Sequence, residues 1–265
     1  MKIFLAGATG AIGRPLVARL VAAGHDVTGT TRSAERAVRI KELGAAPAVL
    51  DVLDAAAVRA AVAEAAPDVV MHQLTDLSGE DFAANGRLRI EGTRNLVDAA
   101  RAAGVDRVIA QSIAWLYVPG DTPAVETDPL NPEARGYEGV VALERTVGEL
   151  PGGLVLRYGT LYGPGTWYAQ DGLIAQRIRS GELVPPALWT SFVHVEDAAD
   201  AAVQALDWPA GVVNVVDDEP AVDWPQAFGG KVAPGAPTGR PISNGRAKEL
   251  GWRPAHPTWR TTLGR

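Results

Sequence analysis

The residues best suited to ligand chemistry are the glycines of a short N-terminal segment, Gly7-Ala8-Thr9-Gly10-Ala11-Ile12-Gly13. The segment follows an apolar run at residues 2–6 that predicts a buried strand, and it opens a helical stretch. Glycines there permit a tight turn and close approach of a phosphate, while the free amides of a helix N-terminus attract the anion. The pattern predicts a binding site for a pyridine dinucleotide, with an ordinary strand-to-helix turn as the alternative. Its predicted contacts are Gly7, Thr9, Gly10, Ala11, Ile12 and Gly13.

The choice between NAD(H) and NADP(H) depends on the end of the second predicted strand. An acidic residue there hydrogen-bonds the free ribose hydroxyls and repels a 2′-phosphate. This chain instead reads Thr30-Thr31-Arg32-Ser33, with no acid before Glu35. A guanidinium suits bidentate phosphate binding, so Arg32 and Ser33 predict NADP(H). A solvated surface charge is the alternative for Arg32.

The elements that must position this site alternate between strand and helix along the first 160 residues. Such alternation predicts an α/β fold with a Rossmann-type, doubly wound parallel sheet. We expect strands at 2–6, 26–31, 48–50, 68–74, 107–112 and 154–157, and helices at 11–23, 55–65, 88–103 and 140–150. Residues 1–160 are predicted to form the cofactor-binding core, and residues 161–265 a small, mainly substrate-binding region with some segments returning to the core. A Pro- and Gly-rich loop is expected at 232–240 and a short helix at 244–250.

Composition excludes several functions. The net charge of −6 argues against a nucleic-acid partner, which needs a clustered basic surface. The chain has no cysteine, and its four histidines show no metal-ligand spacing, so no metal site is expected. No stretch approaches the ~20 apolar residues that span a bilayer. We expect a cytoplasmic protein with a small-molecule substrate and no membrane partner, with a homodimer as the candidate assembly.

The motifs taken together resemble the short-chain dehydrogenase/reductase superfamily. The glycine spacing is G-x-x-G-x-x-G, and later segments are similar to the extended, epimerase/dehydratase-like branch, in family order up to about residue 205. They are Asp51-Val52, Glu91-Gly92-Thr93-Arg94-Asn95-Leu96, Leu156-Arg157-Tyr158-Gly159, Leu161-Tyr162-Gly163-Pro164-Gly165 and Phe192-Val193-His194-Val195-Glu196-Asp197.

The resemblance implies further cofactor contacts. It places Asp51 and Val52 at the adenine, although Asp51 also suits a helix N-cap. Gln73 and Leu74, at the end of the fourth predicted strand, are assigned to the cofactor site as well.

The resemblance also implies a catalytic tyrosine followed four residues later by a lysine, and here the chain departs from the family. Tyr137 is followed at that spacing by Val141, and a register on Glu144 does not restore the pair. We assign Tyr137 as a proton donor in its neutral form, with an aromatic cover of the cleft as the alternative. Ser112, one residue from the family's serine position, is the second catalytic candidate, and a local hydrogen bond is its alternative. His194 has suitable acid/base chemistry, but its apolar surroundings favour a structural histidine.

Aromatic residues indicate a partly apolar substrate site. In the family's topology the loops carrying them lie near the nicotinamide, although each ring also suits core or interface packing. The candidates are Trp115, Tyr117, Trp167, Tyr168 and Trp189. The segment at 185–191 has no cation for a sugar-nucleotide diphosphate.

Three functions remain after these steps. The first is an NADP(H)-dependent oxidoreductase acting on a carbonyl or alcohol of a small, partly apolar metabolite. The second is an epimerase, dehydratase or other isomerase or lyase that uses its cofactor transiently or structurally. The third is a non-catalytic NADP(H) sensor, which the missing lysine makes plausible.

Overall fold

The computed structural model describes residues 1–75 and 81–263, and its contacts divide the chain into two compact units. Each unit is assembled from three stretches of chain. The first comprises Met1–Ser112, Arg135–Leu156 and Ala202–Val212. The second comprises Ile113–Ala134, Arg157–Ala201 and Val213–Arg265. The assignment of residues 1–160 to the cofactor and 161–265 to the substrate stays a prediction.

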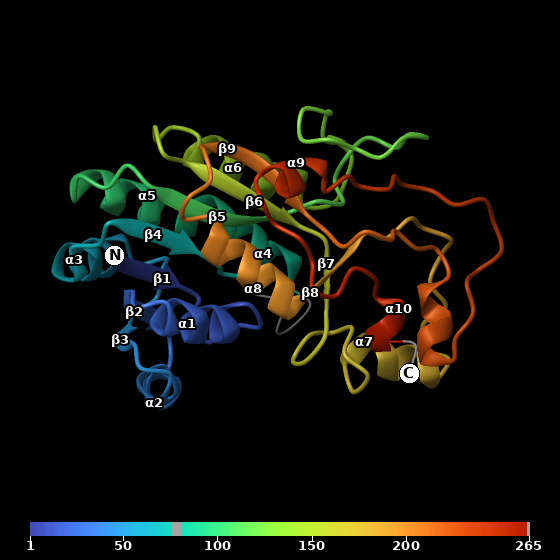
Figure 1. Cartoon of the computed structure of the whole chain (residues 1–265), viewed down its shortest axis with the longest axis horizontal. Helices are drawn as coiled ribbons and strands as arrows, with labels where there is room; N and C mark the ends of the chain where they lie inside the picture. Colours follow the sequence, from blue (N-terminus) through green and yellow to red (C-terminus); the bar gives the residue numbers. More distant parts are fainter. Residues whose placement is uncertain (76–80, 264–265) are drawn as a thin grey trace. The chain divides into compact units, whose positions relative to one another are not determined.

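Seven strands form one sheet (Figure 1). Its order is β3-β2-β1-β4-β5-β6-β9, and β1 pairs in parallel with both β2 and β4. The pairs β2–β3 and β4–β5 are also parallel. The chain builds outward from β1 to β3 and then returns to place β4 on the other side of β1. This reversal is the position at which doubly wound folds bind ligands. The strands are β1 (Lys2–Ala6), β2 (Asp26–Thr31), β3 (Ala46–Val49), β4 (Val69–His72), β5 (Val108–Ile113), β6 (Leu154–Tyr158) and β9 (Gly211–Val215).

In the first unit, helices pack on the sheet because alternate strand residues present apolar side chains to each of its faces. Phe4 and Val70 belong to one buried cluster with residues of α3, α5 and α6, such as Leu96. Ile3 and Leu5 are buried too, and the pleat directs them to the opposite face. The Rossmann-type fold is therefore confirmed. Its helical elements are α1 (Gly13–Ala22), α2 (Ala34–Glu42), α3 (Ala55–Ala65), α4 (Phe82–Arg87), the π-helical turn η1 (Leu88–Gly92), α5 (Thr93–Ala102) and α6 (Tyr137–Val147).

The structure corrects several predicted boundaries. The helix expected at 88–103 is the π-helical turn η1 followed by α5, and the helix expected at 140–150 begins at Tyr137 and ends at Val147. Helix α2 was not predicted, because Ala37 and Ile40 are its only buried residues and its apolar pattern is weak. Strand β9 was also missed.

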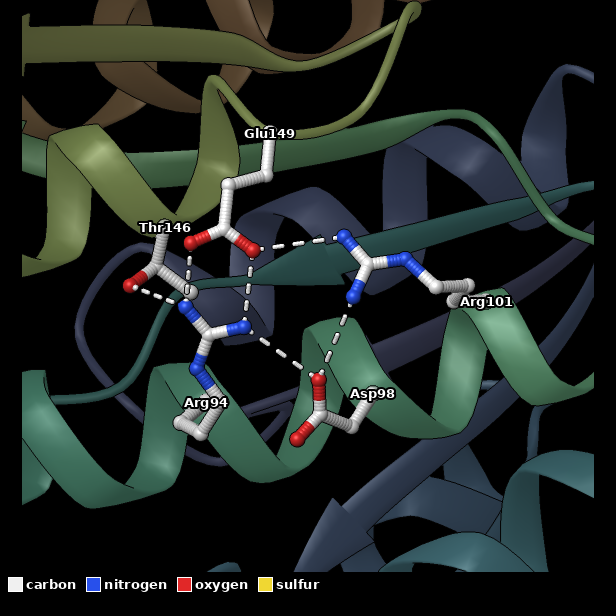
Figure 2. A network of polar contacts seen from close by, with 5 residues as sticks. All are labelled: Arg94, Asp98, Arg101, Thr146 and Glu149. Atoms are coloured by element: carbon white, nitrogen blue, oxygen red, sulfur yellow. Dashed lines mark hydrogen bonds and ion pairs between the residues drawn. The ribbon is translucent and has the colours of Figure 1, made fainter.

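A network of charged side chains ties α5 to α6 across the surface of the first unit, as Figure 2 shows. Arg94 donates to Glu149 through both terminal nitrogens and also bonds Thr146. Asp98 and Arg101 extend the network along α5. Hydrogen bonds from Arg94 and Arg101 lower the pKa of Glu149 to about 2. The network fixes how α6 lies against α5.

The second unit is organised around aromatic side chains. Strands β7 (Thr160–Tyr162) and β8 (Phe192–His194) form a two-stranded parallel sheet. Phe192 contacts Tyr162, Tyr168, Trp224 and Trp259 edge-on or tilted. The helices are α7 (Leu173–Arg179), α8 (Val195–Gln204), which begins in this unit, the 3₁₀ turn η2 (Trp224–Phe228), α9 (Gly245–Glu249) and α10 (Arg260–Leu263).

Two of the C-terminal predictions can be checked directly. Helix α9 confirms the one expected at 244–250, and residues 232–240 contain no helix or strand beyond a single isolated bridge. Across residues 1–75 and 81–263, no helix has the length and apolar character needed to cross a membrane.

Candidate functional site

The glycine turn after β1 uses its three glycines for different purposes. Gly7 has φ +95°, and a Cβ there would lie 2.6 Å from the carbonyl oxygen of Gln73. A Cβ on Gly13 would lie 2.0 Å from the carbonyl oxygen of Gly7. Both positions therefore require glycine for the fold. A Cβ on Gly10 would approach only the Gly7 oxygen, at 3.3 Å, and Gly10 is exposed. The space beside Gly10 is thus open to a ligand.

Helix α1 presents an uncompensated N-terminus at this turn. No side chain caps it, and its first turn contains no acidic residue. Its positive end is therefore available to an anion. Thr9 and Ala11 are half-buried at the rim, whereas Ile12 is buried. Ile12 can contact a bound anion only through its backbone.

The end of β2 lies directly beside the turn. The Gly7 amide donates to Thr30 Oγ1 at 3.3 Å, and the Ser33 amide donates to Thr31 Oγ1 at 3.2 Å. Ser33 caps α2 by accepting from the Arg36 amide. Arg32 is exposed between these anchored residues. Its backbone is thereby held at the edge where the strand ends.

The residues after β3 are largely engaged within their own turn. Asp51 accepts a hydrogen bond from the Leu53 amide at 3.0 Å and is exposed. Val52 is buried, and its carbonyl oxygen accepts from Asn95 Nδ2 at 2.9 Å. Asn95 of α5 thus positions this loop. The adenine contact of Asp51 and Val52 stays a prediction.

Gln73 is a polar side chain buried beside the glycine turn. It is 4% exposed, and neither its Nε2 nor its Oε1 has a hydrogen-bond partner in the described part of the chain. Its backbone amide donates to Ala6 at 2.8 Å, which holds it next to β1. Buried amides are normally satisfied, so an unpaired one at the open glycine turn fits a site completed by a polar ligand. The backbone amide of Leu74 is already bonded to His72.

A buried polar cluster lies at the carboxyl ends of β4 and β5. The Ser112 hydroxyl is fully buried and donates to Glu144 of α6 at 2.8 Å. Arg89 of η1 is 7% exposed and interacts with the charge of Glu144. His72 Nδ1 accepts from the Leu74 amide, so its Nε2 donates to Thr93 at 3.0 Å. Burial, with the neighbouring Arg89 charge, lowers the pKa of His72 to about 4, and His72 is neutral.

The Arg89 side chain runs along the first turn of α6. A Cβ on Gly139 would lie 3.6 Å from the Arg89 Cβ, and a Cβ on Gly136 would lie 3.7 Å from its Nη1. Side chains longer than alanine at these positions would enter the space of the guanidinium. Tyr137, between the two glycines, is half-buried, and Val141 follows it one turn later.

The predicted substrate-binding aromatic residues, all in the second unit, differ in their exposure and in their contacts within that unit. Trp115 is 52% exposed, and Trp167 and Trp189 are half-buried. Tyr117 is buried: its hydroxyl donates to Asn214 Oδ1 and accepts from Arg157, both at 2.7 Å.

Tyr168 packs against Phe192 and Trp224 in the aromatic core. Of the five predicted aromatics, the tryptophans retain surface for a ligand. Tyr117 is engaged by its buried hydrogen bonds, and Tyr168 by its contacts in the aromatic core.

His194 belongs to a second cluster, also within this unit. It stacks on His256 at 3.7 Å between ring centroids, and a Cβ on Gly163 would lie 2.5 Å from its Nε2. His256 Nδ1 lies 3.1 Å from an oxygen of Asp197. These contacts favour the structural role for His194.

Asp217 is buried beside the backbone of Trp259, whose hydrogen bond favours the charged form of its carboxyl group. Desolvation, followed by the charges of Asp218, Glu219 and Asp197, raises the pKa of Asp217 to about 9. Asp217 is therefore a neutral acid at pH 7.

Arg89 and His72, both members of the first unit's polar cluster, were not predicted from the sequence. A signal for Arg89 was present. It precedes Thr93, Leu96, Val97 and Ala100 at helical spacing, so it stands on the buried face of its helix. A charged residue on an apolar face marks a candidate site.

Comparison with known proteins identifies the class. The chain belongs to the NAD dependent epimerase/dehydratase family, whose profile matches residues 3–216. Its fold is similar to that of the Bordetella bronchiseptica enzyme WbmG in complex with NAD and UDP. That likeness has a TM-score of 0.80 and 22% identity over 100% of this chain and 93% of the other. Thermus thermophilus UDP-glucose 4-epimerase, solved with NAD, gives a TM-score of 0.79 and 26% identity over 100% and 98%.

The alignment with a relative from a Streptomyces species covers 100% of both chains. That relative is a 3-diazoavenalumate denitrifying reductase, 44% identical over 308 aligned positions. The chain is thus an enzyme of the epimerase/dehydratase family that is similar over its full length to a reductase.

Proposed function

We propose that this protein is an NADP(H)-dependent reductase of a small aromatic or partly apolar substrate. The observation that carries the proposal is its identity of 44% to a reductase over the full length of both chains. The epimerase alternative is compatible with the family but is not favoured, because the segment at 185–191 contains no cation for a nucleotide diphosphate.

The glycine turn would hold the pyrophosphate of the cofactor. Gly10 leaves room for it, the N-terminus of α1 attracts it, and the unpaired amide of Gln73 offers both a donor and an acceptor nearby. Arg32, exposed at the end of β2, would bind the 2′-phosphate. When bound, the dinucleotide supplies a hydride from nicotinamide C4.

The chain lacks the tyrosine and lysine pair of its superfamily, since Val141 stands four residues after Tyr137. For a carbonyl substrate, the neutral Tyr137 or a water would supply the proton. The relative's name describes reductive removal of nitrogen from a diazo carboxylate. An arenediazonium ion accepts hydride at its terminal nitrogen to give a neutral diazene, which then loses N₂ and leaves an arene. The acceptor is a cation, so hydride transfer itself needs no acid, and the absent lysine is consistent with such a substrate.

The experiment that tests this proposal is a substrate panel with purified protein, with NADPH and NADH side by side. The panel contains arenediazonium carboxylates, aromatic aldehydes and ketones, and UDP-glucose. We expect stoichiometric oxidation of NADPH with the diazonium or carbonyl class, with N₂ release for the former. Epimerised UDP-glucose without net cofactor change would replace this proposal by the epimerase function.

The aromatic residues give a second test of the substrate class. Trp115→Ala and Trp167→Ala should each raise KM for the substrate about tenfold, because an aromatic face contributes about 1 kcal/mol or more to stacking. The Kd of NADPH should stay within twofold of the wild-type value. An equal loss of both affinities, or of neither, would remove these tryptophans from the substrate wall.

A further inference from the structure

The polar cluster of the first unit contains a charged group without a role in the steps above. Arg89 is 7% exposed, and its charge interacts with His72 at the end of β4 and with Glu144 on α6. Gly136 and Gly139 leave open the space that its side chain occupies. An arginine that is almost fully buried is costly unless its charge is used or compensated.

The positive charge of Arg89 does not change with pH in the physiological range. An arginine side chain keeps its proton at every physiological pH. His72 is neutral and adds no second cation. Glu144 offers the opposing charge; it is half-buried and also accepts a hydrogen bond from the Ser112 hydroxyl. Val140 and Val141 on the same helix carry no charge. Arg89 is thus a permanent positive charge, and the Glu144 carboxylate is an opposing charge beside it.

The sheet topology determines which half of a dinucleotide would meet this charge. A dinucleotide bound at the reversal beside β1 extends to both sides of it. Arg32 follows β2, on one side, whereas His72 and Ser112 belong to β4 and β5 on the other. If Arg32 binds the phosphate of the adenosine half, as proposed above, the nicotinamide half lies on the side of Arg89.

We propose that Arg89 is a fixed cation at the nicotinamide half of the cofactor site, and that it makes the protein bind the reduced cofactor in preference to the oxidised one. The reduced ring is uncharged and the oxidised ring carries a positive charge, so Arg89 repels only the latter. Arg89 thereby supplies the charge that the superfamily takes from lysine and favours the reductive direction. This inference rests on the proposed function.

The test is calorimetric titration of the full chain with NADPH and with NADP⁺, without substrate. The quantity measured is the ratio of the Kd of NADP⁺ to the Kd of NADPH. Arg89→Met should lower this ratio about tenfold, the size expected for two unit charges ~10 Å apart in a partly buried site. Arg89→Lys should restore it to within about threefold of wild type. Glu144→Gln keeps an acceptor for Ser112 but removes the opposing charge, so it should raise the ratio.

Arg87→Met is the matched control. Arg87 is two residues away on α4, is 61% exposed and pairs with Glu91, so solvent screens its charge. Its removal should leave the ratio unchanged. If Arg89→Met does not fold, as judged by circular dichroism, a raised ratio in Glu144→Gln supports the proposal. An unchanged ratio in folded Arg89→Met, or in Glu144→Gln, would overturn it. Absence of binding to either dinucleotide in the wild type would instead refute the proposed function.

Discussion

Gly10 differs from the other two glycines of the turn in what surrounds it. Its Cβ would meet only one backbone oxygen at 3.3 Å, whereas a Cβ on Gly13 would collide at 2.0 Å. Gly10→Val should therefore fold but lose dinucleotide binding, with Kd raised at least about a hundredfold, because the branched side chain fills the phosphate space. Gly13→Ala, the comparison, should lower Tm as well. Titration calorimetry and thermal denaturation measure the two effects. Wild-type affinity in Gly10→Val would show that the phosphate binds elsewhere.

Arg32 carries the prediction of cofactor preference. Its neighbours Thr31 and Ser33 are anchored, so the backbone at Arg32 is held while its side chain faces solvent. Arg32→Glu should weaken NADPH binding about tenfold to a hundredfold and leave NADH binding unchanged or improved. Added salt should weaken NADPH binding more than NADH binding in the wild type. A native preference for NADH would remove the NADP(H) assignment while leaving the dinucleotide site in place.

At the scale of elements, the orientation of α6 depends on contacts from both of its sides. Ser112 and Glu144 connect it to β5, and Glu149 connects it to Arg94 and Arg101 of α5 (Figure 2). The glycines that make room for Arg89 lie at the start of the same helix. A small rotation of α6 would therefore alter the polar cluster.

The network of Figure 2 gives a prediction of its own. Arg94→Met should lower Tm by about 2 °C, since exposed ion pairs contribute little singly and Arg94 joins several partners. Arg101→Met, which removes a cation from the same network, should have a smaller effect. Differential scanning calorimetry at low salt and in 1 M NaCl measures both. A difference that persists unchanged in high salt would show that packing, and not charge, accounts for the role of Arg94.

At the scale of the whole molecule, Asp217 makes stability depend on pH. The folded-state pKa is about 9, against 3.8 without burial, so the folded protein retains a proton that the unfolded chain releases above pH 4. The free energy of unfolding should thus fall as pH rises from about 4 to 9. Asp217→Asn removes this cost and should raise Tm by about 5 °C at pH 8, with no gain at pH 4. The exposed Asp121→Asn is the control. Equal shifts at both pH values would mean that Asp217 is not held neutral.

Local sequence determined most of the first unit. Strand β1 and the glycine turn were predicted because an apolar run followed by closely spaced glycines has few other backbone solutions. Helix α2 and strand β9 were not, because the former buries two residues and the latter acquires its partners from distant parts of the chain. Propensity is a weak signal where tertiary pairing decides.

The candidate site also has a part that sequence could predict and a part that it could not. The residue types of the glycine turn and Arg32 were sufficient to predict a dinucleotide and its phosphate, because that chemistry belongs to consecutive residues. Sequence could not show that the Ser112 hydroxyl donates a hydrogen bond to Glu144, nor that Arg89 lies against Gly136. These residues are far apart in the chain, and only the packing of η1 and α6 brings them together. Their burial is also what makes a charge there influential, and burial is a property of the tertiary structure alone.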